Sequence, residues 1–78
     1  MDYESLSSKV ARSTRALLAL RGETIESLAY CTDIAHSTLK RRLNGRSPFT
    51  IDELSTIASH FEVRVGDLLQ PPYEVRSA

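Results

Sequence analysis

The sequence has few cysteines, prolines and glycines, and neither sign of charge is in excess. Its 78 residues include one cysteine, three prolines and three glycines. A single cysteine, Cys31, excludes an internal disulfide, so we expect a protein of a reducing compartment, the cytoplasm. The single cysteine excludes a protein stabilised by internal disulfides, and the low glycine and proline content excludes a low-complexity chain. A chain of this length encloses one hydrophobic core.

Long hydrophobic runs are also absent. No stretch of the sequence is long enough to span a membrane. The first residues, Met1 to Glu4, are acidic and polar, whereas a secretory signal begins with basic residues followed by an apolar run. We therefore expect no membrane partner and no secretion signal.

Signatures of catalysis and of metal binding are missing as well. The sequence contains no glycine-rich phosphate loop, nucleophile motif or pair of catalytic acids. His36 and His60 have no further ligand at a recognisable metal spacing, so we expect no zinc site. The expectation is a protein that is not an enzyme and has no cofactor.

Ten basic and ten acidic residues cancel, which at first argues against a nucleic-acid partner. The two signs are nevertheless segregated along the chain. Residues 9–21 and 34–51 each contain four lysines or arginines and no acid, while the acids occupy residues 2–4, 23–33 and 52–74. This distribution predicts a molecule with one basic face.

Helical spacing of apolar residues predicts five helices, over about 5–21, 24–31, 35–44, 50–61 and 65–69. Cys31 is expected on the partly buried face of the second helix. The side chains expected to point inward are Leu6, Val10, Leu17, Leu18, Ile25, Leu28, Ala29, Leu39, Leu43, Ile51, Leu54, Ile57, Ala58 and Phe61.

Stop and start signals support these boundaries. Gly22 and Gly45 follow the first and third helices, as favoured C-terminal stops do. Thr24 is a good N-cap for the second helix, and Thr50 with Glu53 forms a capping box for the fourth. Prolines at 71–72 end the fifth helix, so we expect one domain over residues 1–70 and a polar tail over 71–78.

Residues 24–45, TIESLAYCTDIAHSTLKRRLNG, resemble the helix-turn-helix of the Cro and lambda-repressor (XRE-type) family. The resemblance continues through residues 49–54, 57–58 and 63–69, and so covers nearly the whole chain. It implies an all-α, compact five-helix lambda-repressor-like domain. The function it implies is that of a phage or bacterial transcriptional regulator, with a recognition helix at about 35–44 in the major groove of a double-stranded DNA operator.

Three positions depart from the family pattern. Asp33 stands at the turn position usually filled by glycine, and aspartate tolerates the left-handed conformation better than most residues. Glu62 replaces the glycine usual between the fourth and fifth helices. Arg42 stands where the family often has an aliphatic residue, so either the helix is slightly rotated or Arg42 buries its stem and keeps its charge in solvent.

The third helix has one face free for a ligand. With Leu39 and Leu43 inward, a rotation of about 100° per residue turns the remaining positions outward or to the flanks. These positions are polar or basic, as a helix in a major groove requires: Ser37, Thr38, Lys40, Arg41 and Asn44.

The resemblance also implies roles for single residues. Positions that read base edges match His36, Ser37 and Arg41, and the guanidinium of Arg41 can bond bidentately to guanine. Positions at the start of the second helix that approach phosphate match Thr24 and Ile25. We expect further backbone contacts, which set register without reading sequence, from Thr38, Lys40, Arg42, Asn44 and Arg46.

One other class of function remains open at this point. The same fold can serve as a protein-interaction module, such as an antitoxin-like partner or a transcription-machinery adaptor. The sequence does not specify the operator, nor does it separate a repressor from an activator, a Cro-like switch or an excision accessory protein. We expect a monomer or a weak homodimer in free solution. Two alternatives stay open: pairing chiefly on DNA through a small apolar patch of Leu68, Leu69, Tyr73 and Val75, or a monomer that reads one asymmetric site.

Overall fold

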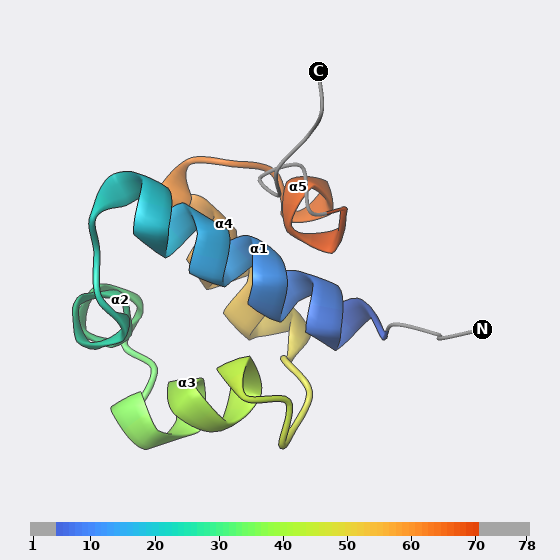
Figure 1. The fold of residues 1–78 in the computed structure, drawn as a ribbon, viewed down its shortest axis with the longest axis horizontal. Coiled ribbons are helices and arrows are strands. Elements are labelled where there is room, and N and C mark those ends of the chain that lie inside the picture. The colour runs from blue at the N-terminus through green and yellow to red at the C-terminus, as the bar shows by residue number, and fades with distance from the viewer. Residues whose placement is uncertain (1–4, 71–78) are drawn as a thin grey trace.

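The computed structural model describes residues 5–70, in which the chain forms five helices and no strand. The helices are α1 (Leu6–Arg21), α2 (Ile25–Thr32), α3 (His36–Leu43), α4 (Ile51–Phe61) and α5 (Val65–Leu69). Helix α1 crosses the middle of the molecule and packs against α3 on one side and α5 on the other (Figure 1). The predicted all-α fold is confirmed. No helix within residues 5–70 is long and apolar enough to cross a membrane.

Local side-chain bonds fix where the helices begin. The Ser5 hydroxyl accepts from the Ser8 amide at 3.1 Å, and the Thr24 hydroxyl accepts from the Ser27 amide at 3.0 Å. The predicted capping box is present, because Thr50 and Glu53 each accept a hydrogen bond from the other's backbone amide. Each cap satisfies amides that have no partner within the helix, which explains the sharp start of α1, α2 and α4.

Two residues with a side chain adopt the left-handed conformation. Asp33, after α2, has φ 61°, and Glu62, after α4, has φ 59°. In each case the backbone amide closes the preceding helix, with that of Asp33 donating to the Ala29 carbonyl and that of Glu62 to the Ala58 carbonyl. Both corners therefore keep the geometry that glycine usually supplies.

A single cluster of buried apolar side chains joins all five helices. The side chains of Leu28 and Leu39 are fully buried, and they lie on the two helices of the predicted helix-turn-helix. Phe61 is the largest fully buried side chain. The core residues are Val10, Ala11, Leu17, Leu18, Leu28, Ala29, Leu39, Leu43, Ile57, Ala58, Phe61 and Leu68.

Three burial predictions are wrong. Leu6 and Ile51, expected inward, are 57% and 82% exposed. Each is the first residue of its helix, where the apolar stripe runs past the edge of the core. Cys31 is exposed because its helix buries the faces of Leu28 and Thr32 instead.

The proposed apolar patch at the end of the chain also needs correction. Leu68 is fully buried in the core, so its side chain cannot belong to a surface patch. Leu69 is half-buried. Tyr73 and Val75, like the rest of the predicted tail, lie outside the described residues.

Two hydroxyl groups are buried in α1 without a partner among residues 5–70, those of Ser13 and Thr14. A buried hydroxyl without a partner costs its lost hydration. We expect Thr14→Val to raise the free energy of unfolding by about 1 kcal/mol, measured by urea denaturation. Thr32→Val is the matched control, because the Thr32 hydroxyl donates to the Leu28 carbonyl at 2.7 Å, and its loss should destabilise. Equal effects of the two changes would contradict this account.

Candidate nucleic-acid interface

Helix α3 is held against the domain by its apolar face. Leu39 and Leu43 are buried, and they lie one helical turn apart. The turn from α2 is closed by a bond from the Ile34 amide to the Ala29 carbonyl at 3.2 Å, and Ile34 packs against the core. This arrangement fixes the orientation of α3 and leaves its other face to solvent.

The predicted outward face is exposed in the structure. Along α3 the side chains of His36, Ser37, Lys40 and Arg41 are exposed, and Thr38 is half-buried. Asn44, which follows the helix, is exposed as well. The structure therefore brings the three predicted base-reading residues and three of the predicted backbone contacts onto one helix and its end.

The two predicted contacts at the start of α2 differ in their surroundings. Thr24 is exposed, and its hydroxyl oxygen accepts the capping bond from Ser27. Ile25 is half-buried and packs against the core, so the polar group it can offer to a phosphate is its backbone amide, in the first turn of α2. Helix N-termini present such amides to anions.

Arg42 lies apart from the outward face. Its Nε donates to Glu53 Oε1 at 2.8 Å, its Nη2 to Glu53 Oε2 at 3.1 Å, and its Nη1 to the Ser47 hydroxyl at 2.7 Å. The two side chains of the ion pair are only 16% and 15% exposed. The guanidinium thus links α3 to the N-terminus of α4. Neither of the two alternatives considered from the sequence, a rotated helix or a charge kept in solvent, included this ion pair.

The same ion pair shifts both ionisation equilibria toward the charged forms. The hydrogen bond from Arg42 lowers the pKa of the Glu53 carboxyl, and the reverse effect raises the pKa of Arg42. Burial opposes both shifts but is the smaller cause. Glu53 also accepts from the Thr50 amide at 3.0 Å, so one carboxylate serves both the capping box and the attachment of α3.

Acid is expected to weaken this attachment. A carboxyl whose pKa is lowered by folding stabilises the fold above its ordinary pKa, about 4.3 for glutamate, and this stability is lost as the pH falls through the lowered value. We therefore expect the free energy of unfolding to fall below about pH 4.3, and Glu53→Gln to remove part of that fall. Urea denaturation at several pH values measures it.

Asp52→Asn is the control for this prediction. Asp52 is an exposed acid in the same first turn of α4, and its side chain has no ion pair in the described chain. Its replacement should leave the acid dependence almost unchanged. The account of the ion pair fails if Glu53→Gln protein loses as much stability on acidification as the unaltered protein.

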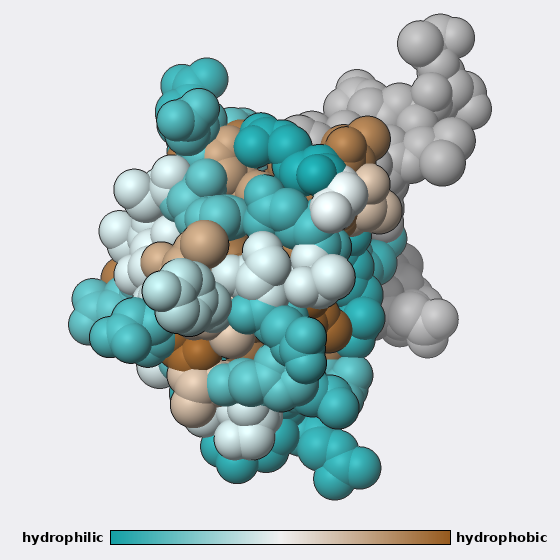
Figure 2. All heavy atoms as spheres, turned by 90° about the vertical axis from the view of Figure 1, so that its left-hand side faces the viewer, coloured by the Kyte–Doolittle hydropathy of each residue, from teal (hydrophilic) through white to brown (hydrophobic). Residues whose placement is uncertain are grey.

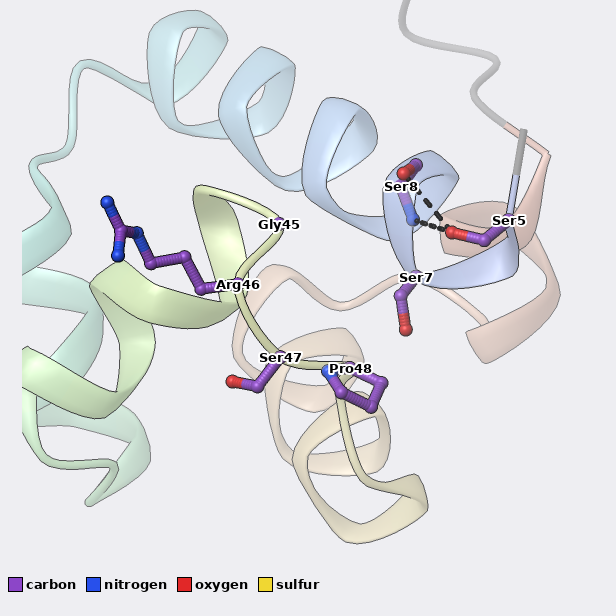
Figure 3. A pocket seen from close by; sticks show the side chains of 7 residues that line it. All are labelled: Ser5, Ser7, Ser8, Gly45, Arg46, Ser47 and Pro48. Carbon is purple, nitrogen blue, oxygen red and sulfur yellow. Dashed lines mark hydrogen bonds between the residues drawn. The ribbon is translucent and has the colours of Figure 1, made fainter. Parts of the chain in front are cut away.

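Arg46 remains beside α3 although it follows the helix. Its amide donates to the Arg41 carbonyl at 2.9 Å, and its side chain is exposed. Figure 3 shows this side chain pointing away from the hollow between the first turn of α1 and the loop of residues 45–48, toward α3. Arg46 therefore places its positive charge beside α3.

Helix α1 contributes Arg15, whose contact with the end of α3 was not predicted from the sequence. Arg15 Nη2 donates to the Leu43 carbonyl at 3.2 Å and to Asn44 Oδ1 at 2.9 Å. These partners are 28 and 29 residues away in sequence, so no local pattern indicates the contact. Arg15 thereby caps the C-terminal end of α3.

The remaining histidine is structural. His60 Nε2 lies 2.7 Å from Glu23 Oε1, and its ring meets the edge of Phe61. Arg21 donates to the Phe61 carbonyl at 2.9 Å, which closes the end of α4. No cluster of potential metal ligands occurs within residues 5–70.

The surface beside α2 is mainly hydrophilic. Figure 2 views the molecule from the side on which α2 lies in Figure 1, and polar side chains cover most of this face. Hydrophobic atoms show only in small separate areas. This face therefore offers polar rather than apolar chemistry to a partner.

Comparisons with known proteins agree with this geometry. Residues 15–73 match the family described as the Cro/C1-type HTH DNA-binding domain. The match spans about three quarters of the chain and includes all of α2 to α5. Comparisons with curated proteins and with solved structures found no match. The chain belongs to the Cro/C1-type helix-turn-helix family and is a DNA-binding regulator.

Proposed function

We propose that this protein is a sequence-specific transcriptional regulator of the phage or bacterial type, which inserts α3 into the major groove of a DNA operator. The observation that carries the proposal is the polar and basic outer face of α3, a helix whose opposite face is packed against the core through Leu39 and Leu43. A helix of this kind fits the major groove, where base edges differ between all four base pairs. Occupying the operator would block or redirect transcription.

Within this proposal the exposed residues divide by role. Arg41 reads guanine, and His36 and Ser37 near the start of α3 contact neighbouring base edges. The phosphate contacts are assigned to Thr24, Ile25, Thr38, Lys40, Asn44 and Arg46.

Arg42 takes a different role in the proposal from the other cations. Its guanidinium is engaged by Glu53 and Ser47 within the domain, so we assign it to holding α3 in place rather than to phosphate. A change at Arg42 should therefore loosen the recognition helix. Its effect should appear in stability as well as in DNA affinity.

Salt tests the proposal against the alternative of a protein-interaction module. DNA binding releases counterions, and log K should fall with log salt at a slope of about −0.9 per phosphate contacted. A protein interface led by apolar contacts should show little such dependence. The slope is obtained by titrating a labelled random duplex with the protein at several salt concentrations between 50 and 200 mM and measuring the binding constant at each. Absence of duplex binding even at 50 mM salt would support the interaction module instead.

We further propose that the protein is a monomer or a weak dimer in free solution and pairs on DNA. Two DNA-bound copies on half-sites about 10 base pairs apart raise each other's effective concentration, so a small contact suffices. Because Leu68 is buried, it cannot belong to the small apolar patch proposed for this contact between the two copies. Sedimentation at micromolar concentration, then titration onto whole and half operators, tests it. A tight dimer without DNA would overturn this part.

A further inference from the structure

The end of helix α4 is bonded to the turn that leads from α1 into α2 (Figure 1). His60 Nε2 lies 2.7 Å from Glu23 Oε1, although 37 residues separate the two in the sequence. An ionised carboxylate only accepts hydrogen bonds, so His60 is the donor of this pair. Both side chains are largely shielded from solvent. The bond therefore fixes the position of the Glu23 carboxylate.

Glu23 stands directly before the N-terminus of α2. Thr24 is the N-cap of this helix, and its hydroxyl accepts from the Ser27 amide. The amides of Ile25 and Glu26 have no partner in the described part of the chain, because the first amides of a helix lack one within it. Together with the positive end of the helix dipole, these amides attract an anion within reach.

Two anions compete for this end of α2. One is the DNA phosphate that the proposed function assigns to Thr24 and Ile25. The other is the carboxylate of Glu23, which is tethered next to the N-cap. A carboxylate released from His60 would be drawn toward the same amides and would repel a phosphate there. The bond to His60 holds it at the end of α4 instead.

The strength of this hold depends on pH. A histidine takes up a proton between about pH 8 and pH 5, and a protonated ring adds the attraction of an ion pair to the hydrogen bond. No other charged side chain on the segments around this end of α4 has a bond to His60 within the described chain. These residues are Arg21 on α1, Glu26 on α2, Glu62 and Arg64 after α4, and Asp67 on α5.

We infer that His60 is a positioning residue for DNA binding, which holds the Glu23 carboxylate away from the N-terminus of α2 and leaves that end of the helix to a phosphate. The hold strengthens as the pH falls, so DNA affinity rises toward acid pH. The inference rests on the proposed function and deepens it by making the contact at α2 respond to pH. His60 itself does not touch the DNA.

The pH profile of binding to a random duplex tests the role of the charge on His60. The sequence has two histidines, so all measurements use His36→Gln protein, in which His60 is the histidine that remains. Its affinity at fixed salt should fall by a factor of about two to five between about pH 5.5 and about pH 8, because a positive charge beside Glu23 is lost. A further change, His60→Gln, keeps a donor but no titrating charge, so affinity should then vary little with pH.

The same measurement at about pH 8 tests positioning separately from charge. A histidine ring is ordinarily neutral at this pH, so His60→Ala removes the hydrogen bond and little charge. The released Glu23 carboxylate should lower affinity by a factor of about two to five. In Glu23→Gln protein, which has no carboxylate to release, His60→Ala should change affinity little. Any loss of folding from the missing ring contact with Phe61 would appear in both backgrounds, so their comparison corrects for it.

Glu26→Gln is the matched control for Glu23→Gln. It removes an exposed acid from the first turn of α2 that has no bond to His60. Both the pH profile and the loss caused by His60→Ala should therefore persist in Glu26→Gln protein.

The outcomes separate this role of His60 from the proposed function. A pH profile that His60→Gln leaves unchanged would overturn the inference, and so would an equal loss from His60→Ala in Glu23→Gln protein and in protein that keeps Glu23. Either result would leave the function of α3 intact. Absence of duplex binding at low salt and at every pH would overturn the proposed function, and the inference with it.

Discussion

Arg41→Ala is expected to abolish the preference of the protein for one or two base pairs of its operator. Arg41 is exposed on the outward face of α3, and none of the described residues accepts a hydrogen bond from its guanidinium. A bidentate contact to a base is worth ~1–3 kcal/mol, or a factor of about 5 to 150 in affinity. Affinity for the selected operator and for operators changed at each base pair, measured at one salt concentration, gives the effect.

Arg46→Ala is the control for this change. It removes the same charge from an exposed residue beside α3, but at a position assigned to the backbone. It should weaken all duplexes alike and flatten the salt dependence by about one unit of slope. If Arg41→Ala instead weakens specific and random duplexes equally, Arg41 does not read bases.

Leu39→Ala is expected to unfold the domain and to remove DNA binding as a consequence. The Leu39 side chain is fully buried where α3 meets the core. Truncation of a buried leucine costs ~2–5 kcal/mol, and a small domain has total stability of only ~5 kcal/mol or somewhat more. Leu28→Ala should behave in the same way because Leu28 is equally buried on α2. Circular dichroism during thermal unfolding measures the loss.

Leu20→Ala provides the matched control. It deletes the same atoms from an α1 side chain that is 68% exposed, so both helicity and DNA affinity should change little. An Leu39→Ala protein that unfolds at the unaltered temperature would show that α3 is not held by this core.

The sequence was most informative where the cause of structure is local. Capping by Thr24 and the capping box of Thr50 and Glu53 each involve residues three apart, and both are present. The left-handed turn at Asp33 is likewise set by the residue itself and by its neighbours. Periodicity within α3 placed Leu39 and Leu43 inward and hence Arg41 outward, because one helical turn relates them.

Burial at helix ends and contacts between distant segments could not be predicted in this way. Leu6 and Ile51 continue the apolar spacing of their helices, yet exposure depends on where the neighbouring helices end. The Arg42–Glu53 ion pair joins two helices across a loop, and Arg15 reaches Asn44 across 29 residues. Both contacts depend on tertiary packing, which periodicity along one helix does not contain.

Selection of bound sites from a pool of random duplexes tests the central claim most directly. The account predicts that the unaltered protein enriches a defined consensus, and that Arg41→Ala protein loses one or two of its positions while keeping the rest. A consensus in two symmetric half-sites about 10 base pairs apart would further indicate pairing on DNA. Recovery of unenriched, random sequence from a folded protein would contradict the claim that α3 reads the major groove.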